Sequence, residues 1–225
     1  DIEVPHYPIS IIYEEESSGI TEEFTVALSK FSENWNRRFH HSSVWPAELV
    51  AQTDKYFPAK GNEGAFTKAS LTPFSIAYVS FSSVQHAHFE NFGIKLWNKA
   101  GNLVSCNLHT IEAASTGAVF TEQFTSDISD SAEENAWPIA GYTYIVIRKE
   151  STHPELCEEF WSGIDFLVYC VNHYIPNLLV GSNGFIAVTD AIHQEVLSIF
   201  SEVTCNGEAR FNLNQAPVVA PIPPQ

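Results

Sequence analysis

The sequence is poor in positive charge and contains no long apolar run. Lys and Arg number 11 against 27 Asp and Glu, which gives a formal net charge of -16. A field of that sign repels nucleic acid and anionic membrane surfaces, so we expect neither as a partner. No stretch approaches the roughly 18 consecutive apolar residues of a membrane helix, and we expect no direct membrane insertion. No basic segment followed by an apolar stretch opens the chain, so we expect it to be mature or a piece of something longer.

Motifs of common enzymes and cofactor sites are also missing. Asp165, His193 and one of the many serines have the residue types of a hydrolase triad. No G-x-S-x-G elbow occurs to hold the serine, so we do not expect nucleophilic catalysis. Gly61–Gly64 is too short for a phosphate-cradling loop. The pairs His40-His41 and His86-x-His88 favour surface histidines over a metal site, because such neighbours do not share a helix face. The sequence therefore predicts a protein that is not an enzyme and uses neither cofactor nor metal.

The four cysteines form no CxxC pair and the chain has no N-x-S/T sequon. Their even number fits disulfides of an oxidising compartment, and four buried thiols are the alternative. Cys157 and Cys170 fall on one predicted helix, where 13 residues at roughly 1.5 Å each hold them too far apart to bond together. Either of them could reach Cys205. The fourth is Cys106.

Apolar residues make up 44% of the chain and aromatic residues 13%, which is enough for a core. Apolar spacing predicts strands at 9–12, 75–81 and 142–147, the last being the strongest strand signal, and a hairpin over 94–105. Helical spacing marks 21–31, 63–70, 155–174 and 189–202. Residues 58–64 and 126–135 are expected to be loops, the second on the surface. This alternation predicts an α/β fold with a largely parallel sheet.

An acidic turn follows the first predicted strand. Ser18 is the expected N-cap of the next helix, and Glu22 and Glu23 lie in its first turn, where the helix dipole favours them. A run of three glutamates at 14–16 is usually a solvated turn. Calcium binding by Glu14 and Glu16 is a further alternative, but no recognisable calcium pattern is present.

Several short motifs follow one another in a recognisable order along the chain. Ile11-Ile12, Ser18-Gly19-Ile20-Thr21 and Phe24-Thr25 resemble the strand, anion loop and helix of periplasmic phosphate-binding proteins. The remaining motifs that carry the resemblance are Trp45-Pro46, Lys60-Gly61-Asn62-Glu63-Gly64, Thr72-Pro73-x-Ser75-Ile76-x-Tyr78-Val79 and Trp137-Pro138-Ile139 before Arg148-Lys149. The resemblance implies the two-lobed type II solute-binding fold, with ligand bound at the hinge. It also implies that the first segment of the family, with the opening strands of both lobes, is lacking here.

The anion loop departs from the family it resembles. Glu14 occupies the position of the family's arginine, Glu16 that of its aspartate, Ser17 that of a glycine and Ile20 that of the first threonine. Only Ser18, Gly19 and the start of the helix at Thr21 agree with the pattern of the family. These seven residues constitute the predicted vestigial anion loop, and a carboxylate in place of a guanidinium predicts weakened anion binding.

The resemblance predicts three parts: a second lobe over 1–137, part of a first lobe over 138–212 after a hinge crossing, and a proline-rich tail over 213–225. We expect an extracellular, periplasmic or cell-surface module, repurposed for structure or protein contact. Another polypeptide segment or chain would complete its sheets, and a homo-oligomer or larger assembly is possible. Exposed members among Phe74, Phe81, Phe89 and Phe92 would mark a contact patch. The alternative is a receptor for phosphate or another small ligand, completed by a separate segment.

Overall fold

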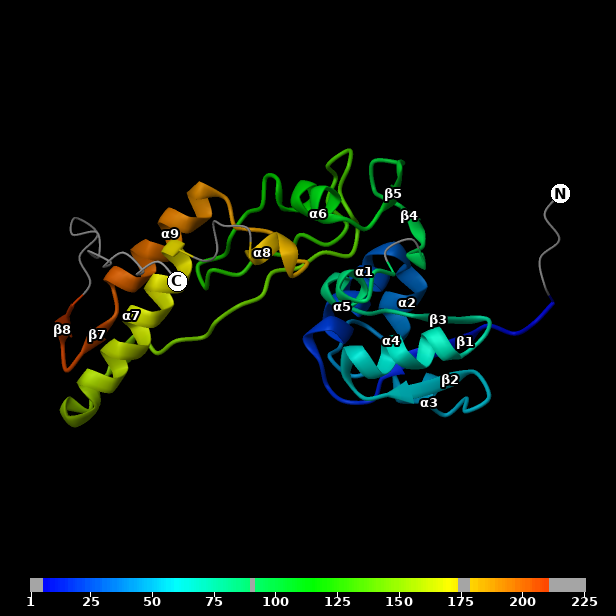
Figure 1. Cartoon of the computed structure of the whole chain (residues 1–225), viewed down its shortest axis with the longest axis horizontal. Coiled ribbons are helices and arrows are strands. Elements are labelled where there is room, and N and C mark those ends of the chain that lie inside the picture. The colour runs from blue at the N-terminus through cyan, green and yellow to red at the C-terminus, as the bar shows by residue number, and fades with distance from the viewer. Residues whose placement is uncertain (1–5, 90–91, 174–178, 211–225) are drawn as a thin grey trace. The chain divides into compact units, whose positions relative to one another are not determined.

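The structure is a computed structural model that describes residues 6–89, 92–173 and 179–210 (Figure 1). The chain divides into two compact units, Asp1–Tyr142 (unit 1) and Thr143–Gln225 (unit 2). The sequence placed the boundary slightly earlier, after residue 137, and the assignment of the units to lobes stays a prediction. The predicted tail over 213–225 lies outside the described residues. In the described part, no helix combines the length and apolar character needed to cross a membrane.

The main sheet of unit 1 is parallel and has the strand order β2-β1-β3 among the described residues. The central strand β1 (Ser10–Glu14) pairs with β2 (Tyr56–Ala59) on one side and with β3 (Ser75–Ala77) on the other. Each connection between these strands passes through a helix, as parallel pairing requires. The predicted α/β class and parallel sheet are therefore confirmed for this part of the chain.

Helices cover both faces of this sheet (Figure 1). Helix α1 (Gly19–Phe31) packs on the face of Tyr13, and α4 (Gly61–Leu71) packs on the face of Ile12. Successive strand residues point to opposite faces, which explains why neighbours in β1 join different clusters. The α1 face holds the aromatic cluster, whose fully or partly buried members include Tyr13, Phe24, Trp35, Trp45, Tyr56 and Tyr78. The α4 face holds mostly smaller side chains, with one aromatic residue among them: Ile12, Ala59, Ala65, Ala69, Ala77, Val79 and Phe57.

The other elements of unit 1 are short. They are α2 (Glu33–Arg38), α3 (Ala47–Val50), α5 (Phe81–His86), β4 (Lys95–Trp97), β5 (Leu103–Ser105) and α6 (Leu108–Ser115). Strands β4 and β5 pair antiparallel, which confirms the predicted hairpin, and Gly101 in its turn has a φ of 84°. A third cluster joins Ala114 of α6 to Ile128, Ala136 and Ala140.

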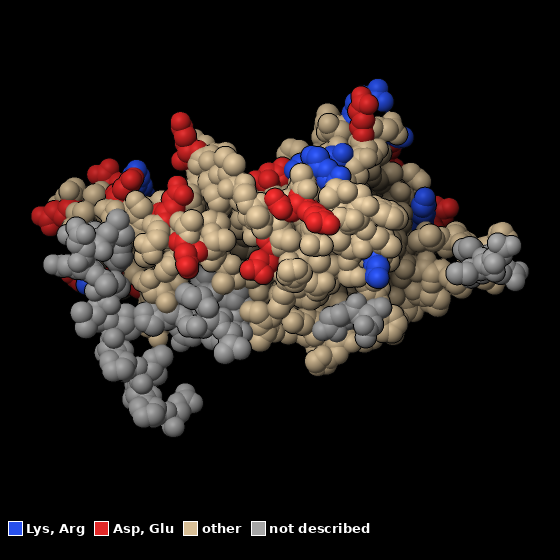
Figure 2. Space-filling model, turned by 90° about the horizontal axis from the view of Figure 1, so that it is seen from above, with Lys and Arg blue, Asp and Glu red and all other residues tan. Residues whose placement is uncertain are grey.

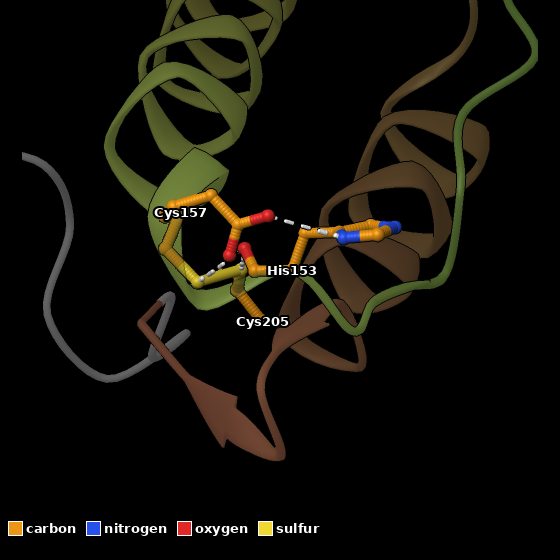
Figure 3. The surroundings of a disulfide bond; sticks show 4 residues. His153, Cys157 and Cys205 are labelled. Carbon is orange, nitrogen blue, oxygen red and sulfur yellow. Dashed lines mark hydrogen bonds and ion pairs between the residues drawn. A yellow bond between two sulfur atoms is a disulfide. The ribbon is translucent and has the colours of Figure 1, made fainter.

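Unit 2 is built around two packed helices. Its elements are β6 (Glu150–Ser151), a 3-10 turn η2 (Pro154–Leu156), α7 (Cys157–His173), α8 (Leu179–Ser182), α9 (Asp190–Ser201), β7 (Thr204–Cys205) and β8 (Glu208–Ala209). Trp161, Ile164 and Val168 of α7 pack with Phe200 and Val203. A disulfide joins Cys157, at the start of α7, to Cys205 in β7, with 5.7 Å between the Cα atoms (Figure 3). The sequence had left the partner of Cys205 open between Cys157 and Cys170.

The strongest strand signal of the sequence, 142–147, is not a strand. This segment pairs with no strand among the described residues, and Ile145 and Val146 are 67% and 93% exposed. Its apolar composition satisfies strand propensity, but a strand also requires a partner backbone, which propensity does not supply. Ile147 instead packs against the helical core of unit 2.

Two loop or strand boundaries were also wrong. The predicted loop over 58–64 begins inside β2 and ends inside α4. The strand predicted over 75–81 stops at Ala77, because Ser80 caps α5 through its side chain. Residues 126–135 contain no helix or strand, but the expected surface loop buries Ile128 and Ser129.

Candidate functional site

The candidate site lies at the carboxyl edge of the main sheet. Strand β1 ends at Glu14 and leads into α1, while β3 ends beside it at Ala77. With the order β2-β1-β3, the connections leaving β1 and β3 diverge at this point. Ligands of open α/β sheets bind at such a divergence, outside the carboxyl ends of the strands.

The amino end of α1 is capped as the sequence predicted. Ser18 Oγ accepts a hydrogen bond from the Thr21 N–H at 3.0 Å, and the Ser18 hydroxyl donates to Thr21 Oγ1 at 3.0 Å. The Ser18 N–H donates to the backbone oxygen of Ser43 at 2.9 Å. The Ser17 hydroxyl donates to Ser43 Oγ at 2.8 Å. The loop that follows β1 is thus fastened to the segment before α3.

Tyr78 connects the end of β3 to this loop. Its hydroxyl lies 2.7 Å from Thr21 Oγ1 and accepts a hydrogen bond from the Glu14 N–H at 3.2 Å. Its ring stacks on Phe24 with 4.5 Å between centroids. Burial is the main cause that raises the pKa of Tyr78, against the lowering effect of its hydrogen bonds. The hydroxyl therefore remains protonated at neutral pH, and the polar groups of Ser18, Thr21 and Tyr78 already satisfy one another.

Glu14 contributes the buried carboxyl group of the site. The residue is 3% exposed, and its Oε2 atom accepts no hydrogen bond from any described residue. Alternation along β1 puts its side chain on the face of Ile12, beside the amino end of α4. A helix dipole contributes about 0.3–1 kcal/mol to a nearby anion. Leaving a buried polar atom unpaired costs about 1–3 kcal/mol, and more for a charge, so the dipole does not offset it.

The surroundings of Glu14 are acidic. Glu15 and Glu16 are exposed directly after it, and Glu22 and Glu23 follow in the first turns of α1. Burial raises the pKa of Glu23, and the charges of Asp127 and Glu22 add to this increase, while Lys30 opposes it. Figure 2 shows acidic side chains spread over one face of the molecule, with basic ones between them.

A lysine compensates part of this charge on the side of α1. Lys30 Nζ lies 2.8 Å from Asp127 Oδ2 and donates to the backbone oxygen of Ser129 at 2.7 Å. Burial would raise the pKa of Asp127, but hydrogen bonds from Lys30 and Ser129 outweigh it, and the net shift is downward. Lys30 therefore neutralises Asp127 and holds the 126–135 segment on α1, whereas Glu14 has no such partner among the described residues.

The structure brings some of the seven predicted loop residues together and separates others. The Glu14 N–H and the Thr21 hydroxyl are both hydrogen-bonded to the hydroxyl of Tyr78. Ser18 is linked to it through Thr21. The remaining four, Glu16, Ser17, Gly19 and Ile20, lie at exposed or half-buried positions. Sequence reasoning gave no role to Tyr78 or Ser43. The sequence offered no signal for Tyr78, because the strand predicted over 75–81 placed it in mid-strand, whereas β3 ends at Ala77 and leaves Tyr78 at the carboxyl edge of the sheet.

The other candidate groups of the sequence do not assemble. Asp165 forms an ion pair with Arg210 at 3.3 Å, and His193 Nε2 lies 3.1 Å from Asn172 Oδ1, so these two residues have separate partners. Within residues 6–89, 92–173 and 179–210, no group of three or more His, Cys, Asp or Glu side chains could hold a metal ion. Burial raises the pKa of the free thiol Cys106 to about 12, which leaves it protonated and unreactive.

No protein-family model matches the chain. Among curated proteins, the phosphate-binding protein PstS of Haemophilus influenzae is 28% identical over 167 residues, covering 72% of this chain and 47% of that protein. PstS of Methanocaldococcus jannaschii is 25% identical over 177 residues, covering 74% of this chain and 44% of that protein. The chain therefore spans less than half the length of these relatives, and the matches support a distant relationship to phosphate-binding proteins.

A further relative belongs to a virus. A protein of Acanthamoeba polyphaga mimivirus, whose name describes a serine/threonine-protein kinase/receptor, is 25% identical over 196 residues. The match covers 84% of this chain and 12% of that protein. A segment of that size can be a single module within a much larger protein.

Proposed function

We propose that this chain is a non-catalytic, extracellular module of the phosphate-binding-protein type that serves structure or protein contact, with an anion site that no longer holds phosphate. The observation that carries the proposal is the buried carboxylate of Glu14 at the carboxyl end of the central strand. The disulfide Cys157–Cys205 supports an oxidising location. The distant phosphate-binding relatives support the type of module.

The electrostatics of the loop oppose an anion. One carboxylate at roughly 4 Å repels a unit negative charge by about 1–4 kcal/mol at effective dielectric constants of about 80 to 20. The dipole at the amino end of α1 stabilises an anion by only about 0.3–1 kcal/mol. The hydroxyls of Ser18 and Thr21 are already engaged in hydrogen bonds, so an anion would have to displace them.

Protein contact is supported by the unequal edges of the main sheet. At the β2 edge, the backbone of Tyr56 and Pro58 points outward, because Lys55 and Ala59 bond to β1. Pro58 has no N–H to offer, and Lys68 Nζ donates to its carbonyl at 2.5 Å. Both features protect an edge from pairing with another strand.

The β3 edge lacks this protection. The Phe74 carbonyl bonds to Ser10 on β1, so the backbone of Ser75 and Ala77 points outward. No strand pairs there among the described residues, and Phe74 and Ile76 beside it are 50% and 42% exposed. An extended segment of another polypeptide, or of a second copy, can add to such an edge. Of the other predicted patch members, Phe89 and Phe92 are 36% and 78% exposed.

The alternative is a receptor for phosphate or another small ligand. The names of the relatives and the amino end of α1, where Gly19 is exposed, favour it. Calorimetric titration of phosphate, sulfate and calcium into the intact chain separates the two functions. If the chain is a contact module, we expect no heat of binding on titration with phosphate. Micromolar affinity for phosphate would establish the receptor function.

The contact role has a test of its own. Light scattering on the purified chain, alone and with candidate partner segments, reports its mass in solution. We expect self-association or capture of a segment, with hydrogen exchange slowed at Ser75 and Ala77. A stable, monodisperse monomer whose β3 edge exchanges fast under every condition would refute it.

A further inference from the structure

The unpaired carboxylate of Glu14 distinguishes this site from the acidic residues around it. Glu15 and Glu16 are exposed and therefore solvated, and Asp127 is paired with Lys30. Glu14 is 3% exposed, and its Oε2 finds no donor among the described residues. A buried carboxyl oxygen without a partner is unfavourable unless a counter-charge or donor reaches it. This atom therefore specifies the chemistry of whatever completes the site.

A cation that donates hydrogen bonds would supply Oε2 with both a donor and a counter-charge. A multivalent metal ion is disfavoured, because no suitable group of three or more ligating side chains occurs in the described part of the chain. A guanidinium is planar, weakly hydrated and able to donate two parallel hydrogen bonds to one carboxylate, which suits a buried position better than an ammonium.

We infer that Glu14 is the acceptor for an arginine side chain of the polypeptide segment that completes unit 1. The inference rests on the proposed protein-contact function and adds the charge and identity of one contacting residue. The turn that follows Glu14 is the nearest solvent-facing part of the chain, because Glu15, Glu16 and Ser17 are exposed. The net charge of -16 draws a basic segment toward the chain and speeds the encounter.

The site would then bind with reversed polarity. The fold still presents the carboxyl edge of a parallel sheet and a capped helix, but the charge that it buries selects a cation in place of an anion. The hydrogen bonds among Ser18, Thr21 and Tyr78 hold the backbone of Glu14 in place for this contact. A carboxylate whose backbone is held in place in advance favours specificity for a planar, bidentate ligand.

The test uses the full chain and two small probes of equal shape. N-acetyl-arginine amide carries the guanidinium, and N-acetyl-citrulline amide replaces it with an uncharged urea group. Amide chemical shifts are followed during titration of each probe. We expect the arginine probe to bind with a dissociation constant of about 1 mM, to shift the amides of Glu14, Thr21 and Tyr78, and to bind at least about fivefold tighter than citrulline, because only it completes a charged pair.

Two variants make the assignment specific. Glu14→Gln preserves shape and removes the charge, and Glu16→Gln removes an equal charge from an exposed position of the same turn. We expect Glu14→Gln to abolish the preference for arginine and Glu16→Gln to leave it within about twofold, as expected for a solvated charge. Equal binding of the two probes, or an unchanged preference in Glu14→Gln, would overturn the inference.

The same spectra separate this inference from the proposed function. Phosphate that shifts Ser18 and Gly19 at micromolar concentration would overturn the proposed function, and with it the inference. Absence of both phosphate and arginine binding would overturn the inference alone and leave the module proposal standing.

Discussion

Unit 1 contains three clusters of buried side chains among its described residues, whereas the described part of unit 2 contains one, and the disulfide closes directly beside it. The sheet of unit 1 is covered on both faces, and Ile12 and Thr21 are fully buried. The strands of unit 2 are two residues long. A small core leaves little stability in reserve, and covalent links are the usual compensation. The comparison indicates that packing stabilises unit 1, and that unit 2 depends on its cross-link.

Removing the disulfide should have the largest effect, and only on unit 2. Cys157 and Cys205 are 48 residues apart, and the chain-entropy model assigns about 4 kcal/mol to a loop of that length. We expect the double variant Cys157→Ser, Cys205→Ser to speed hydrogen exchange throughout α7 and α9. Exchange in β1 and α1 should stay unchanged.

The control for the disulfide variant is Cys170→Ser. This free cysteine lies on the same helix and is half-buried, so its replacement removes a sulfur without opening a cross-link. Its exchange pattern should stay near that of the unmodified protein. Equal loss of protection in both units of the double variant would show that they unfold together, and the comparison between them would fail.

A smaller effect of opposite sign is expected from Gly163→Ala. Gly163 is an exposed residue inside α7, and an added Cβ meets no atom within 4 Å. Alanine favours a helix interior over glycine by about 1 kcal/mol, so unit 2 should be stabilised. Thermal unfolding followed by helix-specific circular dichroism measures the change.

Gly141→Ala is the matched substitution in unit 1. An added Cβ at Gly141 meets the carboxylate of Glu23, which would have to move. We expect Gly141→Ala to leave the free energy of unfolding of unit 1 unchanged or to lower it. In a Glu23→Ala background the same substitution should no longer be destabilising, because the carboxylate that the added Cβ meets is absent. Stabilisation by Gly141→Ala of the size seen for Gly163→Ala would contradict the close packing between α1 and this segment.

The smallest expected effect concerns pH and belongs to unit 1. The pKa of Glu23 is raised above its ordinary value of 4.5, mainly by burial, so its contribution to stability is present below that value and is lost as pH rises through its folded-state pKa. Glu23→Gln should therefore stabilise unit 1 at pH 7 by less than about 1 kcal/mol and have no such benefit at pH 4. Denaturant unfolding at the two pH values tests this, and a benefit that is equal at both would contradict it.

The fold was predictable where a local signal and its tertiary partner coincide. The helix at 21–31 has a Ser18 cap, acidic residues at its start and an apolar face, and it forms as expected. The hairpin around Gly101 contains its pairing partner within ten residues, and it too was found. The segment 142–147 failed because its composition says nothing about whether another backbone is present to pair with it.

The sequence predicted which segment contains the candidate site. It did not predict which side chains of that segment are buried or which distant residues contact them. The sequence placed Glu14 and Glu16 in one acidic turn over 14–19, and so did not predict that one of these two glutamates would be buried and the other exposed. The structure separates them completely: Glu14 ends a strand and is buried, and Glu16 is exposed. Tyr78, which is 57 residues from Thr21, joins the site only because β1 and β3 are adjacent in the sheet.

The sequence by itself determined the charge, the α/β class, the Ser18 cap of α1 and the resemblance to phosphate-binding proteins, since each depends on composition or on spacing along the chain. The tertiary structure decided which cysteine pairs with Cys205, which sheet edge is left unprotected and which glutamate is buried. The physical reason is that burial and pairing depend on residues distant in the chain. The same carboxyl group is unremarkable in water, but in the protein interior it requires a partner.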